Sequence, residues 1–164
     1  MGEPVWEDGV VTISRAVGRR SVRAVLFDDH DRLLLIKRTK PGQPPYWTTA
    51  GGAVELDDSS RESALQRELL EELGARIVVG PQVFLTSTGN DDLVDVQHFF
   101  VCRVINVDPS LRTGPEHTDP TRGGYHLVRA LPEQLAMLDI KPGKLRAFLA
   151  DNVDAMLSEA ALLG

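Results

Sequence analysis

The residues best suited to chemistry are three glutamates on one predicted helix, preceded in the chain by a pair of glycines, Gly51 and Gly52. Glu68, Glu71 and Glu72 stand three and four residues apart, and on a helix turning about 100° per residue they fall within an arc of roughly 100°. Like charges at these spacings destabilise an isolated helix by about 0.3 kcal/mol per pair, so the face needs a partner. A divalent cation is a suitable partner, because hard cations prefer carboxylate oxygens.

The helix that carries these acids is predicted from its end signals and its apolar stripe. Ser59 followed three residues later by Glu62 forms a capping box, and Gly74 supplies the left-handed stop that commonly ends a helix. An apolar residue recurs at every fourth position: Leu65, Leu69 and Leu73. We therefore expect the helix to lie on a core and to present its acids at the rim.

The remaining chain alternates strand-forming runs with turns. The polar segment 28–31 separates two apolar runs and predicts a hairpin, and Gly80-Pro81 is expected to split two later strands. A short helix at 131–135 and an amphipathic final helix over 145–157 follow. The predicted strands are 10–13, 21–27, 33–36, 46–49, 76–79, 83–88, 94–105 and 125–129.

With the glycines, the acids and the flanking strands in place, the chain resembles the Nudix hydrolases. Their pattern is Gly, five residues, Glu, seven residues, then Arg-Glu-aliphatic-x-Glu-Glu-x-Gly-aliphatic. The resemblance implies an α/β fold in which a mixed β-sheet lies between helices, an α/β/α sandwich. We expect one domain over residues 1–164, with 1–9 as a tail or edge segment. The second half of the pattern is met by Arg67, Glu68, Leu69, Glu71, Glu72, Gly74 and Ala75.

The first half of the pattern is displaced by one residue. Counting forward from Gly52 reaches Asp58, with eight residues before Arg67 instead of seven, and Ala50 replaces the family's usual proline. A one-residue insertion near Asp57 or Asp58 is the simplest account. In the family the first glutamate supports the loop, and here that role stays open between Asp57, Asp58 and neither.

The resemblance implies hydrolysis of a pyrophosphate linkage, in a nucleoside diphosphate linked to another group or a nucleoside triphosphate, by water attack at phosphorus. Mg²⁺ or Mn²⁺ is the implied cofactor, held by Glu68, Glu71 and Glu72. The expected catalytic residues are Glu71, Glu72, Arg67 and Glu116, with Arg67 orienting the acids through a pair with Glu71. Glu71 is one candidate base, and the others lie outside the motif: Glu116, Asp91, Asp92 and Asp95.

Substrate contacts are predicted at Arg38, Tyr46, Trp47, Gly51 and Gly52. Arg38 could bind phosphate or remain a solvated cation at a strand end. Tyr46 and Trp47 could stack on a base or pack in the core, since aromatic side chains do both. The expected partner is a small nucleotide-type substrate, and self-association as a homodimer is left open.

Composition limits the remaining function classes. The formal net charge of −6 gives no basic footprint for duplex nucleic acid. The single cysteine, Cys102, excludes an internal disulfide and lies within a strand-forming run, where we expect a core thiol. No segment reads as a signal peptide or a membrane span, so the predicted compartment is the cytoplasm.

Two other readings compete with an active hydrolase. The inserted residue and Ala50 would suit a relative that keeps the fold as a nucleotide-binding or regulatory domain with weak or no turnover. Isomerisation of a prenyl diphosphate on the same scaffold is disfavoured, because such enzymes by resemblance need a catalytic cysteine, and Cys102 lies in mid-strand.

Overall fold

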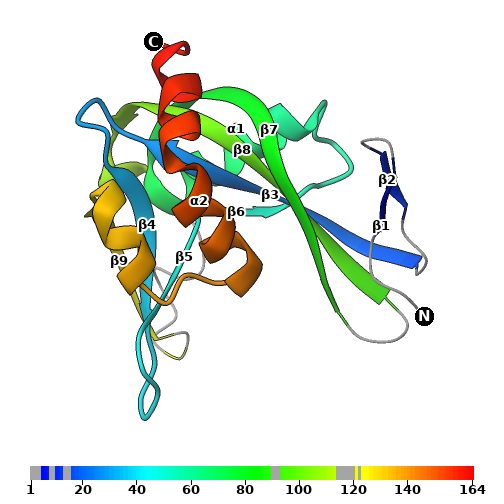
Figure 1. Ribbon diagram of the computed structural model, residues 1–164, viewed down its shortest axis with the longest axis horizontal. Helices are drawn as coiled ribbons and strands as arrows, with labels where there is room; N and C mark the ends of the chain where they lie inside the picture. The colour runs from blue at the N-terminus through cyan, green and yellow to red at the C-terminus, as the bar shows by residue number, and fades with distance from the viewer. Residues whose placement is uncertain (1–4, 8–9, 13–15, 90–92, 114–120, 122) are drawn as a thin grey trace.

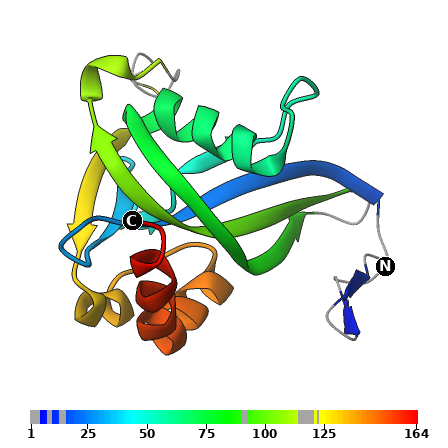
Figure 2. The same ribbon diagram turned by 90° about the horizontal axis from the view of Figure 1, so that it is seen from above.

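A mixed β-sheet lies between two helices in the computed structural model, which describes residues 5–7, 10–12, 16–89, 93–113, 121 and 123–164. Helix α1 (Arg61–Leu73) covers one face of the sheet and α2 (Gly143–Ala161) covers the other (Figures 1 and 2). The α/β class and the sandwich expected from the sequence are therefore confirmed. No helix in the described part of the chain is long and apolar enough to cross a bilayer.

The strands of the main sheet run in the order β5-β4-β3-β8-β7, with β6 paired to β3 and β9 paired to β4. Strands β3 and β8 are parallel, while the other pairs are antiparallel, so the sheet is mixed. A separate two-stranded sheet pairs β1 with β2. The bounds are β1 (Val5–Glu7), β2 (Val10–Thr12), β3 (Ala16–Phe27), β4 (Leu33–Thr39), β5 (Tyr46–Thr48), β6 (Gly51–Ala53), β7 (Ala75–Gly89), β8 (Leu93–Val107) and β9 (Gly124–Ala130).

Strand β3 changes partner along its length, and this change positions the glycine turn. It pairs with β6 at residues 21–23 and with β4 at residues 26–27, while β8 runs along its other side. The β4–β5 hairpin therefore leaves β3, and the chain returns to it through Gly51 and Gly52.

Side-chain alternation along the strands divides the core into two layers. Val22, Ala24 and Leu26 of β3 pack with the leucine stripe of α1. Val25 and Phe27, from the intervening positions, pack with Leu145 and Leu149 of α2. The predicted stripe is buried, since Leu65 and Leu69 are 0% exposed and Leu73 is 3% exposed.

The structure corrects two details of the predicted elements. The N-cap of α1 is Ser60, whose side chain accepts a hydrogen bond from the Ser63 N–H, so the helix starts one residue later than the Ser59 capping box predicts. Strand β7 is continuous through Gly80-Pro81 because β8 pairs with it on both sides. A register shift between Val79 and Gln82 leaves Pro81 in a bulge, where no ladder hydrogen bond is required.

Two short 3₁₀ helices lie in the described residues between β8 and α2. Helix η1 (Pro109–Leu111) follows β8, and η4 (Pro132–Met137) follows β9, where the sequence predicts a short helix. The Asp108 N–H donates to the carbonyl of Gly74 at 2.8 Å, and the Thr113 N–H donates to the carbonyl of Glu71 at 2.9 Å. The segment after β8 is thereby fixed to the C-terminal end of the acidic helix.

Candidate active site

The glycine turn lies directly against the carboxylate of Glu68. A Cβ built at Gly52 would stand 2.6 Å from Glu68 Oε1 and closer still to its other carboxyl atoms, so a larger residue there would displace the Glu68 carboxylate. A Cβ at Gly51 would collide with the carbonyl oxygen of Val22, and Gly51 also has φ of 154°, which side chains rarely adopt. Gly51 is therefore needed for β6 to pair with β3, and Gly52 leaves room beside the backbone for the Glu68 carboxylate.

Arg67 joins the loop after the turn to the acidic face of α1. Its Nε and Nη2 donate to the two oxygens of Asp58 at 3.0 and 2.9 Å, and Nη2 also donates to the carbonyl of Ala53 at 3.1 Å. The remaining nitrogen, Nη1, lies 3.0 Å from Glu68 Oε1 and 3.4 Å from Glu71 Oε2. The expected pair between Arg67 and Glu71 is present, and Asp58 rather than Asp57 supports the loop.

Arg67 compensates the negative charges of the carboxylates around it to different degrees. The hydrogen bonds from Arg67 hold the pKa of Asp58 below its usual value, and the same contact raises the pKa of Arg67. Burial raises the pKa of Glu68, and the like charges of Glu71 and Glu55 add to this effect, although Arg67 opposes it. One arginine thus serves four carboxylates, which leaves the acidic face with excess negative charge.

That donor set fits a divalent cation. The side chain of Glu68 is 15% exposed and that of Glu71 is 43% exposed, so carboxylate oxygens are available at the rim of the helix. Glu72, on the next part of the same face, lines a small cleft with Arg112, Tyr125 and apolar side chains of β4 and β9. Carboxylates that combine excess charge with partial exposure are the ligands hard cations choose.

The predicted substrate contacts are placed in two environments. The guanidinium carbon of Arg38 lies 3.7 Å from the ring centroid of Tyr125 and 5.9 Å from that of Tyr46, so this cation is stacked on aromatic faces. Tyr46 is half-buried and also has Lys141 Nζ 4.8 Å from its ring centroid. Trp47 packs against the core layer on the α2 side of the sheet. Of the two alternatives for Trp47, stacking on a base or packing in the core, this position favours the core.

Among the candidate bases, only two are within the described residues. Glu71 has the position given above, and Asp95 accepts a hydrogen bond from the Ser21 hydroxyl at 3.0 Å, in the middle of β3, where Ser21 is the register partner of Ala53. The predictions for Glu116, Asp91 and Asp92 lie outside the described residues.

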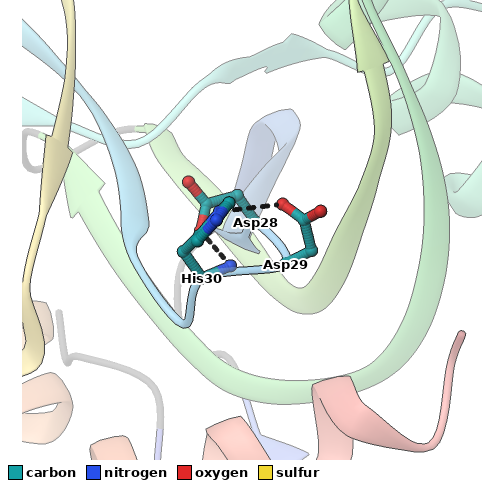
Figure 3. A group of neighbouring side chains, drawn as sticks. All are labelled: Asp28, Asp29 and His30. Carbon is teal, nitrogen blue, oxygen red and sulfur yellow. Dashed lines mark hydrogen bonds and ion pairs between the residues drawn. The ribbon is translucent and has the colours of Figure 1, made fainter.

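Among the described residues, the group of three whose metal-ligand atoms converge lies in the turn between β3 and β4 and is not formed by Glu68, Glu71 and Glu72. One ligand atom from each of Asp28, Asp29 and His30 lies within 4.8 Å of the others (Figure 3). The oxygens of Asp28 are already engaged, since Oδ1 accepts from the His30 and Arg32 N–H groups and Oδ2 accepts from Arg32 Nε at 2.9 Å. Burial acts to raise the pKa of Asp28, but these hydrogen bonds outweigh it and the pKa is lowered. We therefore interpret Asp28 as a residue that stabilises the turn.

Sequence reasoning left out several residues that the structure brings to the site. Glu55 lies 3.6 Å from Arg67 Nη1, and Tyr125 stacks with Arg38. Arg23, a charged residue within the apolar half of β3, lies near the site on the opposite face of the sheet and donates to the carbonyl of Thr49 at 3.1 Å, just before the glycine turn. Its position in a Val-Arg-Ala-Val run is a signal that could have identified it.

Comparison with known proteins gives consistent matches. The family model described as NUDIX domain matches residues 17–145. The CTP pyrophosphohydrolase of Escherichia coli (strain K12) is 44% identical over 62 residues, which is 38% of this chain and 45% of that protein, so the match spans less than half the length of the curated relative.

Solved structures agree on the fold. The solution structure of the Escherichia coli ORF135 protein is 25% identical, with a TM-score of 0.60, and the alignment covers 88% of this chain and 91% of that one. A NUDIX hydrolase from Nitrosomonas europaea is 17% identical with a TM-score of 0.64, covering 87% of this chain and 90% of that one; at this identity the likeness concerns the fold.

Proposed function

Because the chain belongs to the Nudix hydrolase family, we propose that it hydrolyses a pyrophosphate linkage in a small nucleotide-type substrate. The substrate class is a nucleoside diphosphate linked to another group or a nucleoside triphosphate, and the cofactor is Mg²⁺ or Mn²⁺. The observation that carries this proposal is the contact between Gly52 and the Glu68 carboxylate, on a helix face whose acids share one arginine.

Glu68, Glu71 and Glu72 hold the cation in this proposal. A bound divalent cation would supply positive charge that offsets the charge of the phosphates and would make water a better nucleophile near neutral pH. A pyrophosphate approaching the helix without it would meet only like charge. Arg67 keeps Glu68 and Glu71 oriented, because its guanidinium is itself held by Asp58.

Water attack at phosphorus also needs a group that accepts a proton. Glu71 is the described candidate, since it is half-exposed beside the other acids, and the N–H of Thr113 fixes the backbone of its turn. Glu116 follows Thr113 by three residues in the sequence and is the candidate from outside the helix. The base is proposed to be one of these two carboxylates.

The relative named CTP pyrophosphohydrolase makes CTP the first substrate to test, beside other nucleoside triphosphates, dinucleotides and sugar nucleotides. Product identification would show which phosphorus is attacked. With Glu72 replaced by Gln, we expect metal-dependent turnover to fall by about a hundredfold or more, since one ligand charge is removed from the site. The fold should persist, because Glu72 is only partly buried.

Glu62→Gln is the matched control for this experiment. Glu62 is an exposed glutamate in the first turn of the same helix, so its replacement removes the same charge away from the acidic face. Unchanged turnover in Glu72→Gln, or an equal loss in both variants, would refute the assignment of Glu72.

The same panel tests the alternative of a nucleotide-binding domain without turnover. Tight binding of one nucleotide with no product, in the presence of either metal, would support that alternative. The motivation for that alternative is the inserted residue and Ala50, and the pairing of Asp58 with Arg67 supplies the carboxylate that the insertion displaces. An active enzyme is therefore the function we propose.

A further inference from the structure

A cationic cavity lies on the α2 side of the sheet, beside the glycine turn. Its volume is about 240 Å³, and it is lined by Arg23, Thr48, Thr49, Gln97, Lys141 and Pro142. Arg23 stands between Val22 and Ala24, which pack toward α1, so its own side chain points to the opposite face. The cavity is thus separated by the sheet from the carboxylates of α1.

The two cations of this cavity have no acidic partner among the described residues. Within the part of the chain that the structure describes, neither Arg23 nor Lys141 takes part in an ion pair, and no aspartate or glutamate lines the cavity. Arg23 Nη1 donates to the carbonyl of Thr49 at 3.1 Å, which holds the guanidinium at the cavity wall, and Lys141 Nζ lies 4.8 Å from the ring centroid of Tyr46. In a protein of net charge −6, two such cations mark a local site for negative charge.

Other groups in the wall add to this preference. The hydroxyls of Thr48 and Thr49 and the amide of Gln97 can donate hydrogen bonds. Pro142, the N-cap of α2, also lines the cavity, and the first turn of that helix carries neither a side-chain cap nor an acidic residue. The partial positive charge of the helix start therefore adds to that of the two side chains.

We propose that this cavity binds a terminal phosphate group, as a monoester or as inorganic phosphate, because such a dianion matches two cations. The inference rests on the proposed function for its location: Arg23 is the register partner of Gly51, and Gly52 touches the carboxylate of Glu68. Strand spacing and residue rise place the cavity on the order of 10 Å from the acidic face. The phosphate is either borne on the substrate, away from the cleaved linkage, or free in solution as an effector.

The first experiment measures inorganic phosphate binding by equilibrium dialysis, with full-length protein in EDTA. Without metal the α1 carboxylates repel phosphate, so binding reports the cavity and does not depend on turnover. The variants are Lys141→Met alone and Arg23→Gln with Lys141→Met. We expect Kd to rise about tenfold for each cation removed, which is about 1.4 kcal/mol per step. Arg19→Gln, which removes an exposed charge from the same strand, should bind as the unmodified protein does.

The second experiment distinguishes the two sources of the phosphate. NADPH and NADH differ only by a 2′-phosphate, and coenzyme A and dephospho-coenzyme A differ only by a 3′-phosphate. A kcat/KM preference of about tenfold for the phosphorylated member of a pair, lost in Lys141→Met, assigns a substrate-borne phosphate. Binding of inorganic phosphate without such a preference assigns a free effector.

The proposal is overturned if inorganic phosphate binds the unmodified protein no more tightly than it binds the double variant. Failure of every substrate would instead refute the proposed hydrolysis and leave the binding result standing. The two ideas can therefore fail separately.

Discussion

At the scale of single residues, the site depends on how Asp58 holds Arg67. Both Asp58 oxygens accept from the guanidinium, and Oδ2 also accepts from the backbone N–H of Glu55 at 2.8 Å. One carboxylate therefore fixes the loop after the glycine turn and leaves Arg67 Nη1 directed at Glu68 and Glu71. Residues that orient metal ligands in this way commonly affect metal affinity or activity by about 10–100-fold.

Replacing Asp58 by Asn tests that dependence. The amide cannot accept both guanidinium hydrogen bonds, so Arg67 should lose its fixed position and the acids their orientation. We expect the Mg²⁺ concentration that gives half-maximal turnover to rise about tenfold or more. Asp57→Asn is the matched control, because Asp57 is exposed and carries the same charge one residue away. Equal behaviour of the two variants would refute the role assigned to Asp58.

The sequence predicted Arg67 and the three acids of α1 but could not choose between Asp57 and Asp58. Spacing locates an inserted residue only within a loop, and the loop's backbone decides which side chain turns inward. The cavity formed by Arg23 and Lys141 is harder to predict from the sequence, because tertiary packing brings β3 and the segment before α2 together. The Lys141 N–H donates to the carbonyl of Trp47 at 2.9 Å, a contact between distant parts of the chain.

At the scale of elements, short-range sequence signals predicted most helices and strands, and tertiary contacts such as strand pairing determined where those elements begin and end. The apolar stripe and Gly74 predicted the body and the end of α1, since both depend on residues close in sequence. Gly80-Pro81 was expected to break a strand, but β8 pairs along both halves of β7, so tertiary pairing overrode the local preference. The N-cap was displaced by one residue because adjacent serines offer the same chemistry.

The start of α1 gives a prediction that separates those serines. Ser60 accepts a hydrogen bond from the Ser63 N–H at 3.0 Å, whereas Ser59 contacts only the Ser63 hydroxyl. We expect Ser60→Ala to lower the free energy of unfolding by about 1 kcal/mol, the usual value of an N-cap. Urea denaturation would measure it.

Ser59→Ala is the control for the cap, with an expected change within about 0.5 kcal/mol, as for other exposed positions. If Ser59→Ala lowered the free energy of unfolding more than Ser60→Ala does, the result would support Ser59 as the N-cap, as the capping box in the sequence predicts.

At the scale of the whole molecule, one buried histidine ties three strands together. His98 of β8 is 3% exposed, with Nδ1 2.8 Å from Gln82 Oε1 of β7 and Nε2 3.1 Å from Arg20 Nη1 of β3. These partners require a neutral ring, in which Nδ1–H donates to the glutamine and Nε2 accepts from the arginine. Burial first, and then the positive charges of Arg61 and Arg20, lower the pKa of His98 to about 4.

The lowered pKa makes global stability depend on pH in a defined window. The unfolded chain binds a proton at His98 near pH 6.5 while the folded chain does not, so this stabilising contribution is complete above pH 6.5. It is lost as pH falls toward about 4, where the folded ring also becomes protonated. Each pH unit in the window corresponds to about 1.4 kcal/mol, so the loss is at most roughly 3 kcal/mol.

Urea denaturation between pH 7 and pH 4 would measure this loss, with His98→Asn as the variant that cannot titrate. The carboxylates titrate in both proteins, so the difference between the two pH profiles isolates the histidine. An NMR titration of the His98 ring in the unmodified protein gives the same information if the variant does not fold. A ring pKa near 6.5 would contradict the neutral, strand-bridging histidine, because a ring that protonates readily cannot be accepting a hydrogen bond from Arg20.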